Sequence, residues 1–465
     1  MSAIVTTALS KCARSAVAFV SAVILSVALA GQASAQSLIR DAEIEDTLRV
    51  YTEPLLVAAG VRPEEVHIYI VNDDSVNAFV AGGQNIFVHT GLILAADNPN
   101  EVIGVLAHET GHIAGGHLAR SREAINRSLG TALISIGLGV LAIAAGAPDA
   151  GAALISGSQA FAMGTFVRHS QVQESAADQA ALSYLERSGQ SGQGLLDFFN
   201  ENMRPYEFMV RRAPPYMVTH PYSSDRVEAL RQGIENSSNA GATDSADNVR
   251  RFEMMQAKLI GFIRNQGQTL ARYPATDTSA AARYARTIAY YRENSLPEAQ
   301  RELSSLMAED PGNAYYQELM GQILFDSGRA ADSIPYHRRS LELAPGEPLF
   351  QINLARALSA ANGRQGANEA VPLLQAALAR EPDNAFAWRE LAQARNLQGD
   401  EAQAELASAE QNFAIGNYSA ALSFAERARR SLPRNTPSYQ RAMDLVSFSS
   451  EQVREMQRQG GARRS

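Results

Sequence analysis

The chain has 465 residues, of which 46% are hydrophobic and 19% charged, and its formal net charge is −8. This composition excludes an intrinsically disordered chain and gives enough length for two or three folded domains. The negative net charge and the lack of a basic stripe argue against a nucleic-acid-binding protein.

The first 35 residues have the three parts of a secretory signal peptide. Lys11 and Arg14 supply a positive n-region, an apolar segment follows, and residues 33–35 (Ala-Ser-Ala) form a cleavage site. A membrane anchor is the alternative, but the apolar segment is short and leads directly into the small-residue site. We therefore expect export and cleavage after Ala35. The only cysteine, Cys12, leaves with this segment, so the mature chain has no disulfide.

Periodic segments predict the elements that come next in the chain. Residues 37–65 carry apolar side chains at helical spacing. In 67–93, β-branched and aromatic runs are broken by Asp-Asp and Gly-Gly pairs, which predicts short strands joined by turns. Asn98-Pro99 then begins a helix, because proline suits the first turn and Glu101 is favourable at the positive end of the dipole.

This helix carries the sequence HETGHIAGGH over residues 108–117. In an H-E-x-x-H motif the two histidines, His108 and His112, lie one turn apart on the same helix face and can bind one zinc ion. Glu109 lies beside the metal and can accept a proton from water. Two unrelated surface histidines are the alternative, but the helix is otherwise apolar, and burying two unpaired histidines is costly. The motif therefore predicts a zinc site.

A catalytic zinc site needs a third protein ligand. His117 is a candidate, but the pattern H-E-x-x-H-x-x-G-x-x-H needs its last histidine at the position of Leu118. If the helix continued, His117 would point about 180° away from His108. We therefore interpret His117 as a surface histidine that does not bind the metal.

The other candidate is a glutamate on a later helix, 171–185, which contains Glu174 and Asp178 one turn apart. Glu174 would bind the metal, and Asp178 would accept the free N–H of a ligand histidine and select its tautomer. Spacing alone leaves open an ordinary helix with two exposed acids.

Two apolar stretches, 129–147 and 151–167, separate these candidates and predict a helical hairpin. The first stretch is uncharged, so a membrane span has to be considered. A single span would place His112 and Glu174 on opposite sides of the membrane, so only a two-pass hairpin or none is compatible with one shared metal. Because the second stretch contains several polar residues, we favour a hairpin outside the membrane that lies near the active site or touches the outer membrane.

The C-terminal half is predicted to be helical and repetitive. Residues 233–248 are polar, small and rich in Gly, Ser and Asn, which is typical of a linker. After it, Pro311 and Pro345 are 34 residues apart, and other landmarks recur at tetratricopeptide-like offsets. A generic helical bundle is the alternative. We expect a metalloprotease domain over 36–232, a linker over 233–250 and a tetratricopeptide-repeat domain over 251–465, which stacks its repeats and binds partners.

The motifs in combination carry a family resemblance. HETGH, ESAAD at 174–178 and THPYSSDR at 219–226, with NAFVAGGQNIFVHTGLI before the first of them, resemble the HtpX-like and CaaX-prenyl-protease-like zinc peptidases. With the export signal and the repeats, nearly all of the mature chain resembles the periplasmic members of this family. The resemblance implies a mainly α protein, with an α+β gluzincin protease domain that contains a small sheet, followed by an all-α tetratricopeptide solenoid.

The resemblance also implies the ligands and the base. His108, His112 and Glu174 would hold one Zn²⁺ per chain, and Glu109 would be the general base of peptide hydrolysis. It singles out His220, which either takes the place of water on the zinc and keeps the enzyme latent, or stabilises the oxyanion after it swings away. A loop histidine beside Pro221 is the plain alternative.

Arg226 matches the family pattern, but its role stays open at this stage, and pairing with an acid is one reading. The implied task is quality control in the periplasm: the protein degrades outer-membrane proteins that stall and helps β-barrel proteins assemble. Its partners would be the β-barrel assembly machinery and unfolded outer-membrane clients. The alternatives are a chaperone or scaffold with a latent protease, and a membrane-associated protease that acts on membrane proteins.

The segment 84–90 (QNIFVHT) is expected to be the edge strand that binds substrate. In zinc peptidases an edge strand pairs with an extended substrate and presents its carbonyl to the metal. An ordinary structural strand in a small sheet is the alternative.

Overall fold

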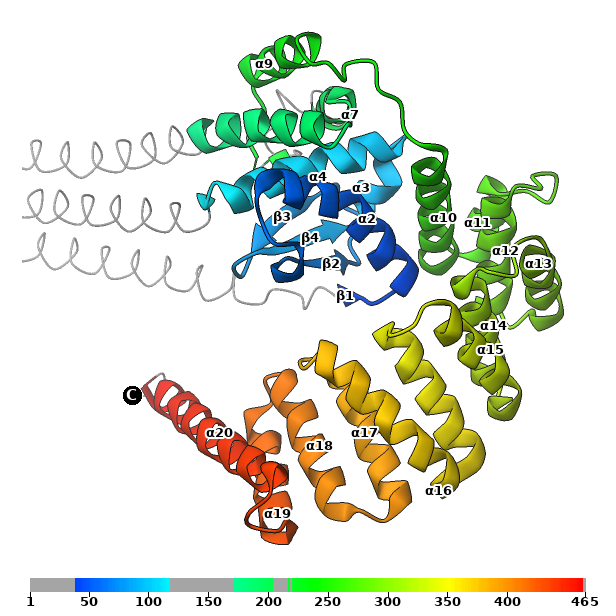
Figure 1. Cartoon of the computed structure of the whole chain (residues 1–465), viewed down its shortest axis with the longest axis vertical. Coiled ribbons are helices and arrows are strands. Elements are labelled where there is room, and N and C mark those ends of the chain that lie inside the picture. Colours follow the sequence, from blue (N-terminus) through cyan, green and yellow to red (C-terminus); the bar gives the residue numbers. More distant parts are fainter. Residues whose placement is uncertain (1–37, 118–170, 204–215, 218–219, 463–465) are drawn as a thin grey trace, which may run out of the picture. The chain divides into compact units, whose positions relative to one another are not determined.

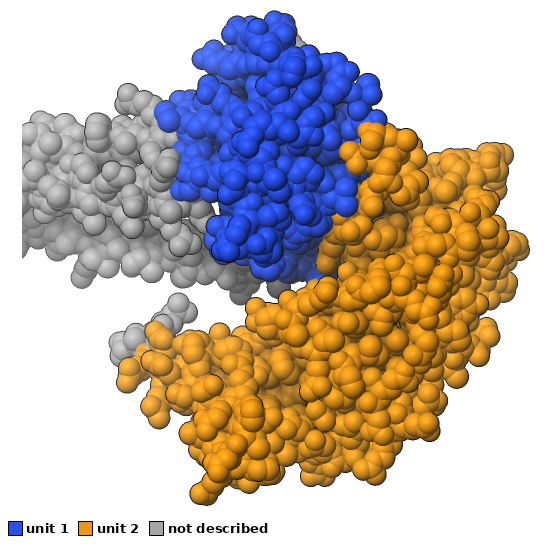
Figure 2. Space-filling model, in the orientation of Figure 1, with its two compact units in different colours: residues 1–40, 48–244 blue, residues 41–47, 245–465 orange. Residues whose placement is uncertain are grey.

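The computed structural model describes residues 38–117, 171–203, 216–217 and 220–462. The predicted signal peptide (1–35) and the predicted apolar hairpin (129–167) lie outside the described residues. Contacts divide the chain into two compact units: residues 1–40 with 48–244, and residues 41–47 with 245–465 (Figure 2). Each unit is considered by itself.

Unit 1 combines a small sheet with helices that gather around it (Figure 1). The strands are β1 (Leu38–Ile39), β2 (His67–Val71), β3 (Ala78–Ala81) and β4 (Asn85–His89). Their order is β1-β2-β4-β3, with β2 and β4 parallel and the other pairs antiparallel. The buried side chains of Ile70, Ile86 and Val88 contribute to the core.

The helices of unit 1 follow the sequence signals closely. They are α2 (Ala42–Ala59), whose residues up to Thr47 count with unit 2, α3 (Thr90–Ala95), α4 (Pro99–Ala114), a helix over 171–187, α7 (Gln193–Phe198) and α9 (Ser224–Glu235), with a short 3-10 turn η1 (Pro63–Glu65) and a π-helical turn η2 (Phe199–Met203). The helix predicted within 37–65 is confirmed over α2; it ends at Gly60, whose φ is +72°. Positive φ favours glycine, and this residue therefore stops the helix.

The expectation that 84–90 forms the edge strand is wrong. β4 lies inside the sheet, with β2 on one side and β3 on the other. The reason is the tight turn at Gly82-Gly83, where both φ values are positive, because it folds β3 back as a hairpin partner on the outer side of β4. Among the described strands, β1 and β3 each pair on one side only, and β3 is the one that covers β4.

Unit 2 is all-α and continues as successive antiparallel helices (Figure 1). Its helices are α10 (Ala246–Ile263), α11 (Gln266–Arg272), α12 (Ala280–Arg292), α13 (Leu296–Glu309), α14 (Ala314–Asp326), α15 (Ala330–Leu343), α16 (Pro348–Arg380), α17 (Ala385–Gln398), α18 (Glu401–Ala414), α19 (Tyr418–Ser431) and α20 (Pro437–Ala462). α12, α14 and α16 begin 34 residues apart, which is the tetratricopeptide period. α16 contains both helices of its pair, with a bend at Gly363.

The boundary between the units falls between residues 244 and 245, inside the segment predicted as a linker. Both ends of that segment are helical, because α9 reaches Glu235 and α10 begins at Ala246. In the part of the chain that the structure describes, no helix has both the length and the apolar character needed to cross a membrane.

Candidate metal centre and active site

The helix that carries the motif is buried on nearly all sides. Asn98 caps it, since its side chain accepts a hydrogen bond from the Glu101 amide at 3.1 Å, and Pro99 occupies its first position. Residues 99–111 are all buried, and the side chains of His108 and Glu109 have no exposed surface. Burial of this kind is expensive for polar groups, so these side chains need partners within the protein or from a ligand.

Gly111 lets a second helix approach the motif closely. A Cβ atom at this position would lie 2.9 Å from the carbonyl oxygen of Ala177 and 3.1 Å from its Cα. Any larger residue at 111 would therefore force the helix over 171–187 away from α4. The small residues on both sides of this contact bring Glu174 to the face on which His108 and His112 lie.

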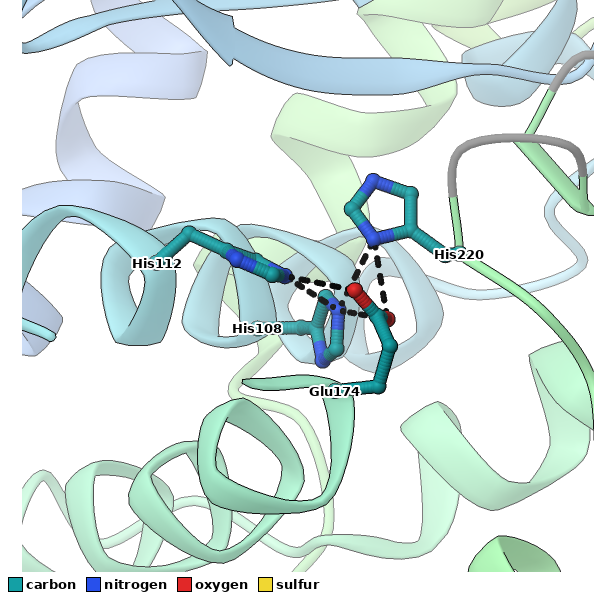
Figure 3. Close-up of side chains that lie close together, drawn as sticks. All are labelled: His108, His112, Glu174 and His220. Carbon is teal, nitrogen blue, oxygen red and sulfur yellow. Dashed lines mark hydrogen bonds and ion pairs between the residues drawn. The ribbon is translucent and has the colours of Figure 1, made fainter. Parts of the chain in front are cut away.

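Four side chains converge at this crossing: His108, His112, Glu174 and His220 (Figure 3). The Nε2 atom of His108 lies 3.1 Å from Nε2 of His112, 3.3 Å from Oε2 of Glu174 and 3.3 Å from Nδ1 of His220. His112 Nε2 is 3.4 Å from Glu174 Oε1, and His220 Nδ1 is 3.0 Å from Glu174 Oε2. One ligand atom from each side chain lies within 4.8 Å of all the others, so the four could hold one metal ion.

The pKa values of the two motif histidines are shifted in opposite directions. Burial acts to lower the pKa of His108, but hydrogen bonds to Asp178 and Glu174 outweigh it and raise that pKa to about 9. Burial and the neighbouring His108 hold the pKa of His112 well below its usual range, so His112 stays neutral and keeps a lone pair. The carboxylates thus favour positive charge beside His112, whose neutral ring offers a nitrogen lone pair.

A second layer of charged groups fixes the ligands. Oδ1 of Asp178 lies 2.9 Å from Nδ1 of His108, on the side away from the cluster. Arg226 donates to both oxygens of Asp178, at 2.6 and 2.8 Å, and its Nη1 lies 3.2 Å from Glu174 Oε2. Burial acts to raise the pKa of Asp178, but Arg226 and His108 lower it, so this carboxylate stays ionised. The open question about Arg226 therefore has a structural answer, since it binds both acids of the ESAAD motif.

Glu109 lies beside the four candidate ligand side chains and is not one of them. His220 Nε2 is 3.4 Å from its Oε1, and neither of its carboxylate oxygens has a hydrogen-bond partner of good geometry among the described residues. Burial raises the pKa of Glu109, while His220, His108 and the backbone of Val80 on β3 act against this shift. A carboxylate with a raised pKa is a better proton acceptor near neutral pH.

The interpretation of His117 as a surface residue is wrong, because only 5% of it is exposed. Its Nδ1 lies 3.0 Å from Nδ1 of His112, on the opposite side of that ring from Glu174. The direction predicted for a continued helix does not apply, because α4 ends at Ala114 and Gly116 has a φ of +60°. His117 is therefore outside the set of four, but in contact with one of its members.

Tyr216 was not singled out by the sequence. It is fully buried, its ring lies 4.5 Å from the ring of His220, and its carbonyl oxygen accepts a hydrogen bond from the His220 amide at 2.7 Å. These contacts hold His220 in place. An aromatic residue four positions before the histidine is too weak a signal to have identified it.

The chain is similar to a known protein family and to several known proteins. Residues 40–234 match the model of peptidase family M48. The β-barrel assembly-enhancing protease of Yersinia pestis is 29% identical over 356 residues, which cover 75% of this chain and 71% of the relative. The protein of the same name from Escherichia coli (strain K12) is 28% identical over 371 residues, 78% of this chain and 74% of the relative. The crystal structure of YrrB, a tetratricopeptide protein with an unusual peptide-binding site, is similar over 42% of this chain and 97% of its own, with 16% identity and a TM-score of 0.32.

Proposed function

Because residues 40–234 form a metalloprotease domain of peptidase family M48, we propose that the protein is a zinc-dependent endopeptidase of the periplasm. It degrades outer-membrane proteins that fail to assemble and assists the assembly of β-barrel proteins. The name of its relatives, β-barrel assembly-enhancing protease, supports the proteolysis and the assistance in assembly. The observation that carries the proposal is the convergence of four ligand atoms next to a buried glutamate.

The spacing of the four atoms suits zinc. A tetrahedral zinc ion with ligands at about 2.0–2.1 Å separates neighbouring ligand atoms by about 3.3–3.4 Å. Five separations among these side chains run from 3.0 to 3.4 Å, with His108 and His220 nearest Oε2 of Glu174 and His112 nearest its Oε1. One ligand atom from each of the four lies within 4.8 Å of the others. Imidazole nitrogens and a carboxylate oxygen are also the donors that catalytic zinc sites use.

Each residue around the proposed zinc ion has its own role in peptide hydrolysis. When bound, zinc lowers the pKa of a coordinated water to about 7 and polarises the peptide carbonyl. Glu109 accepts the proton of the attacking water and delivers it to the leaving amine nitrogen. Asp178 accepts the Nδ1 hydrogen of His108, which directs the Nε2 lone pair to the centre, and Arg226 keeps Asp178 ionised.

The substrate is proposed to bind on β3 rather than on β4. β3 is the edge of the sheet on the side of the site, since the backbone of Val80 lies close to the Glu109 carboxylate. An extended segment that adds to this edge makes main-chain hydrogen bonds and places its carbonyl near Glu109. This mode of binding needs an unpaired strand, so it favours unfolded or unassembled β-rich clients.

His220 is proposed to keep the enzyme latent. Its Nδ1 lies within 3.3 Å of ligand atoms of both His108 and Glu174, so it occupies the fourth position that water needs. The variant His220→Ala is then expected to hydrolyse an unfolded protein substrate faster than the wild type. Unchanged or slower hydrolysis would contradict the blocking role and favour a role for His220 in stabilising the oxyanion.

Unit 2 is proposed to bind the partners, among them the β-barrel assembly machinery. It has a groove of about 380 Å³ between its later repeats, lined by apolar, polar and charged side chains that include Trp388, Leu391, Arg395, Glu410 and Arg441. A groove of this chemistry can accept an extended peptide segment.

The proposed enzyme is tested by metal analysis and proteolysis of the purified mature protein. We expect one zinc ion per chain after dialysis, and hydrolysis of a reduced, unfolded protein that a chelator abolishes and added zinc restores. A protein that retains no zinc, or hydrolysis that is insensitive to chelation, would contradict the proposal.

A scaffold that assists assembly without proteolysis is the second candidate, and the groove in unit 2 is the observation that favours it. Cells that carry Glu109→Gln in place of the wild type separate the two. If client assembly persists while degradation stops, the scaffold role is independent of the protease. If both are lost, assembly depends on hydrolysis.

A further inference from the structure

α4 ends in a turn that brings a third histidine back against the motif. Gly115 caps the helix, Gly116 takes a positive φ of +60°, and His117 then packs onto the ring of His112. The two rings are 4.9 Å apart and nearly perpendicular, at 80°. Because positive φ is costly for residues with a Cβ, glycine at 116 makes this reversal possible.

The contact between the two rings joins Nδ1 of His117 to Nδ1 of His112, 3.0 Å apart. His112 directs its other nitrogen, Nε2, to His108 and Glu174. A neutral histidine that uses the lone pair of Nε2 carries its hydrogen on Nδ1, so His112 is the donor and His117 the acceptor. This hydrogen bond selects the tautomer of His112 and orients its ring.

The same turn is tied to the helix that supplies the carboxylate ligand. The side-chain Nε2 of Gln173 donates to the carbonyl oxygen of His117 at 3.3 Å, and both groups are buried. Gln173 directly precedes Glu174. The position of His117 is therefore coupled to the helix that carries Glu174.

Gly115 is needed because it leaves room for the ring of His117, and its backbone conformation does not require glycine. Its φ and ψ are −70° and −13°, which any residue can adopt. A Cβ atom there would lie 2.4 Å from Nε2 of His117 and 2.8 Å from two of its ring carbons. Any side chain at 115 would thus displace the His117 ring without strain in the helix.

We propose that His117 is a positioning residue for the metal, which acts through the hydrogen bond that its Nδ1 accepts from Nδ1 of His112. The inference rests on the proposed zinc site and adds to it a residue that binds no metal itself. Partners of ligand histidines of this kind raise ligand basicity, and their loss costs about 10–100-fold in metal affinity.

The first test compares two substitutions at 117 by zinc competition against a chromophoric chelator. His117→Leu keeps an apolar volume but has no acceptor, so its zinc affinity should fall by about 10–100-fold. His117→Asn places Oδ1 close to the position of Nδ1, and should recover most of the loss. Equal affinities for wild type and His117→Leu would overturn the proposal, as would His117→Asn binding as weakly as His117→Leu.

The second test displaces His117 without changing it. Gly115→Ala should weaken zinc binding in the wild type and have no further effect when His117 is already leucine, because both changes remove the same hydrogen bond. Additive losses in the double variant would contradict the proposal. Thermal unfolding of the zinc-free proteins is the folding control, and equal midpoints show that the losses arise at the metal.

The proposed function and the role of His117 can be tested separately. If the wild-type protein binds no zinc, the proposed function fails and the role of His117 fails with it. If the wild type binds zinc tightly and His117→Leu binds it equally well, the metalloprotease stands and only the role of His117 is wrong.

Discussion

Each unit of the molecule buries a cluster of charged side chains, and the two clusters differ in how their polar atoms are paired. In unit 1, four ligand atoms converge on one point, and the oxygens of Glu109 and Nε2 of His220 have no hydrogen-bond partner among the described residues. In unit 2, Lys258 Nζ lies 2.8 Å from Asp41 Oδ2 and 3.1 Å from Glu43 Oε2, and the Tyr284 hydroxyl donates to Glu43 at 2.7 Å.

The difference distinguishes a cluster whose unpaired polar atoms can bind a ligand from a cluster whose charged groups are paired within the protein. A buried polar atom without a partner costs stability, so such atoms persist where a ligand or a reaction uses them. A buried charge whose partners are all present has a structural role. The two clusters do not differ in burial, because Lys258 and Glu109 are each almost entirely buried. Burial alone therefore does not identify the active site, whereas unpaired atoms beside converging ligands do.

The largest effect is expected from Glu109→Gln in unit 1. Loss of the general base should lower kcat/KM for an unfolded substrate by about 10²–10⁴-fold. Zinc affinity should not fall, because Glu109 is not among the ligands. Thermal stability should be kept or increase, because burial raises the pKa of this carboxyl and so makes its charged form costly at neutral pH. A marked loss of stability would show that Glu109 has a structural role, like the charged residues of the cluster in unit 2.

The next effect is expected from Lys258→Met in unit 2, which leaves Asp41 and Glu43 without their cation. Removal of one partner of a buried ion pair should destabilise the unit by about 3–5 kcal/mol. The only tryptophan, Trp388, lies in this unit, so its fluorescence during denaturation measures the change. Combining the substitution with Glu43→Gln should restore part of the loss. An unchanged midpoint would mean that the cluster is not structural.

Zinc removal should act on unit 1 and spare unit 2. At a free zinc concentration one hundred times Kd, the ion stabilises the folded state by about 2.7 kcal/mol, which a chelator removes. Helical circular dichroism should show the loss in unit 1, while the transition reported by Trp388 stays where it was. A parallel shift of the Trp388 transition would contradict the separation of the two clusters.

A smaller effect than the preceding three is expected from Tyr284→Phe. This substitution removes one buried hydrogen bond to Glu43, which keeps its contact with Lys258, so a loss of about 0.5–1.5 kcal/mol should follow. Tyr315→Phe is a matched control in the same unit, because its hydroxyl donates to the more exposed Asp46 and should matter less. A larger effect from the control would reverse the expected order.

The sequence could supply the parts of the site that depend on local periodicity. The relation between His108 and His112 follows from one helical turn, and the cap at Asn98 from proline and dipole preferences. Glu174 lies far along the chain, and its approach depends on Gly111 and Ala177, which no spacing rule reveals. Resemblance to a family, rather than periodicity, singled it out.

Errors arose where a local pattern was extended beyond its element. The prediction for His117 assumes that the helix continues, whereas α4 ends at Ala114 and Gly115 and Gly116 reverse the chain. The strands within 67–93 were correctly predicted as strands, but their order was not, because pairing is a long-range property. The strand with the free edge is therefore β3 and not β4.

The edge formed by β3 also has a consequence for self-association. An unpaired strand edge attracts any extended chain, including another copy of the same protein, and long apolar edges promote aggregation. β3 has only four residues, AFVA, and ends at two glycines. Such a short edge offers few main-chain hydrogen bonds, so a strand that adds to it binds weakly and dissociates quickly. If substrate adds to this edge as proposed, cleaved segments are expected to leave quickly for the same reason.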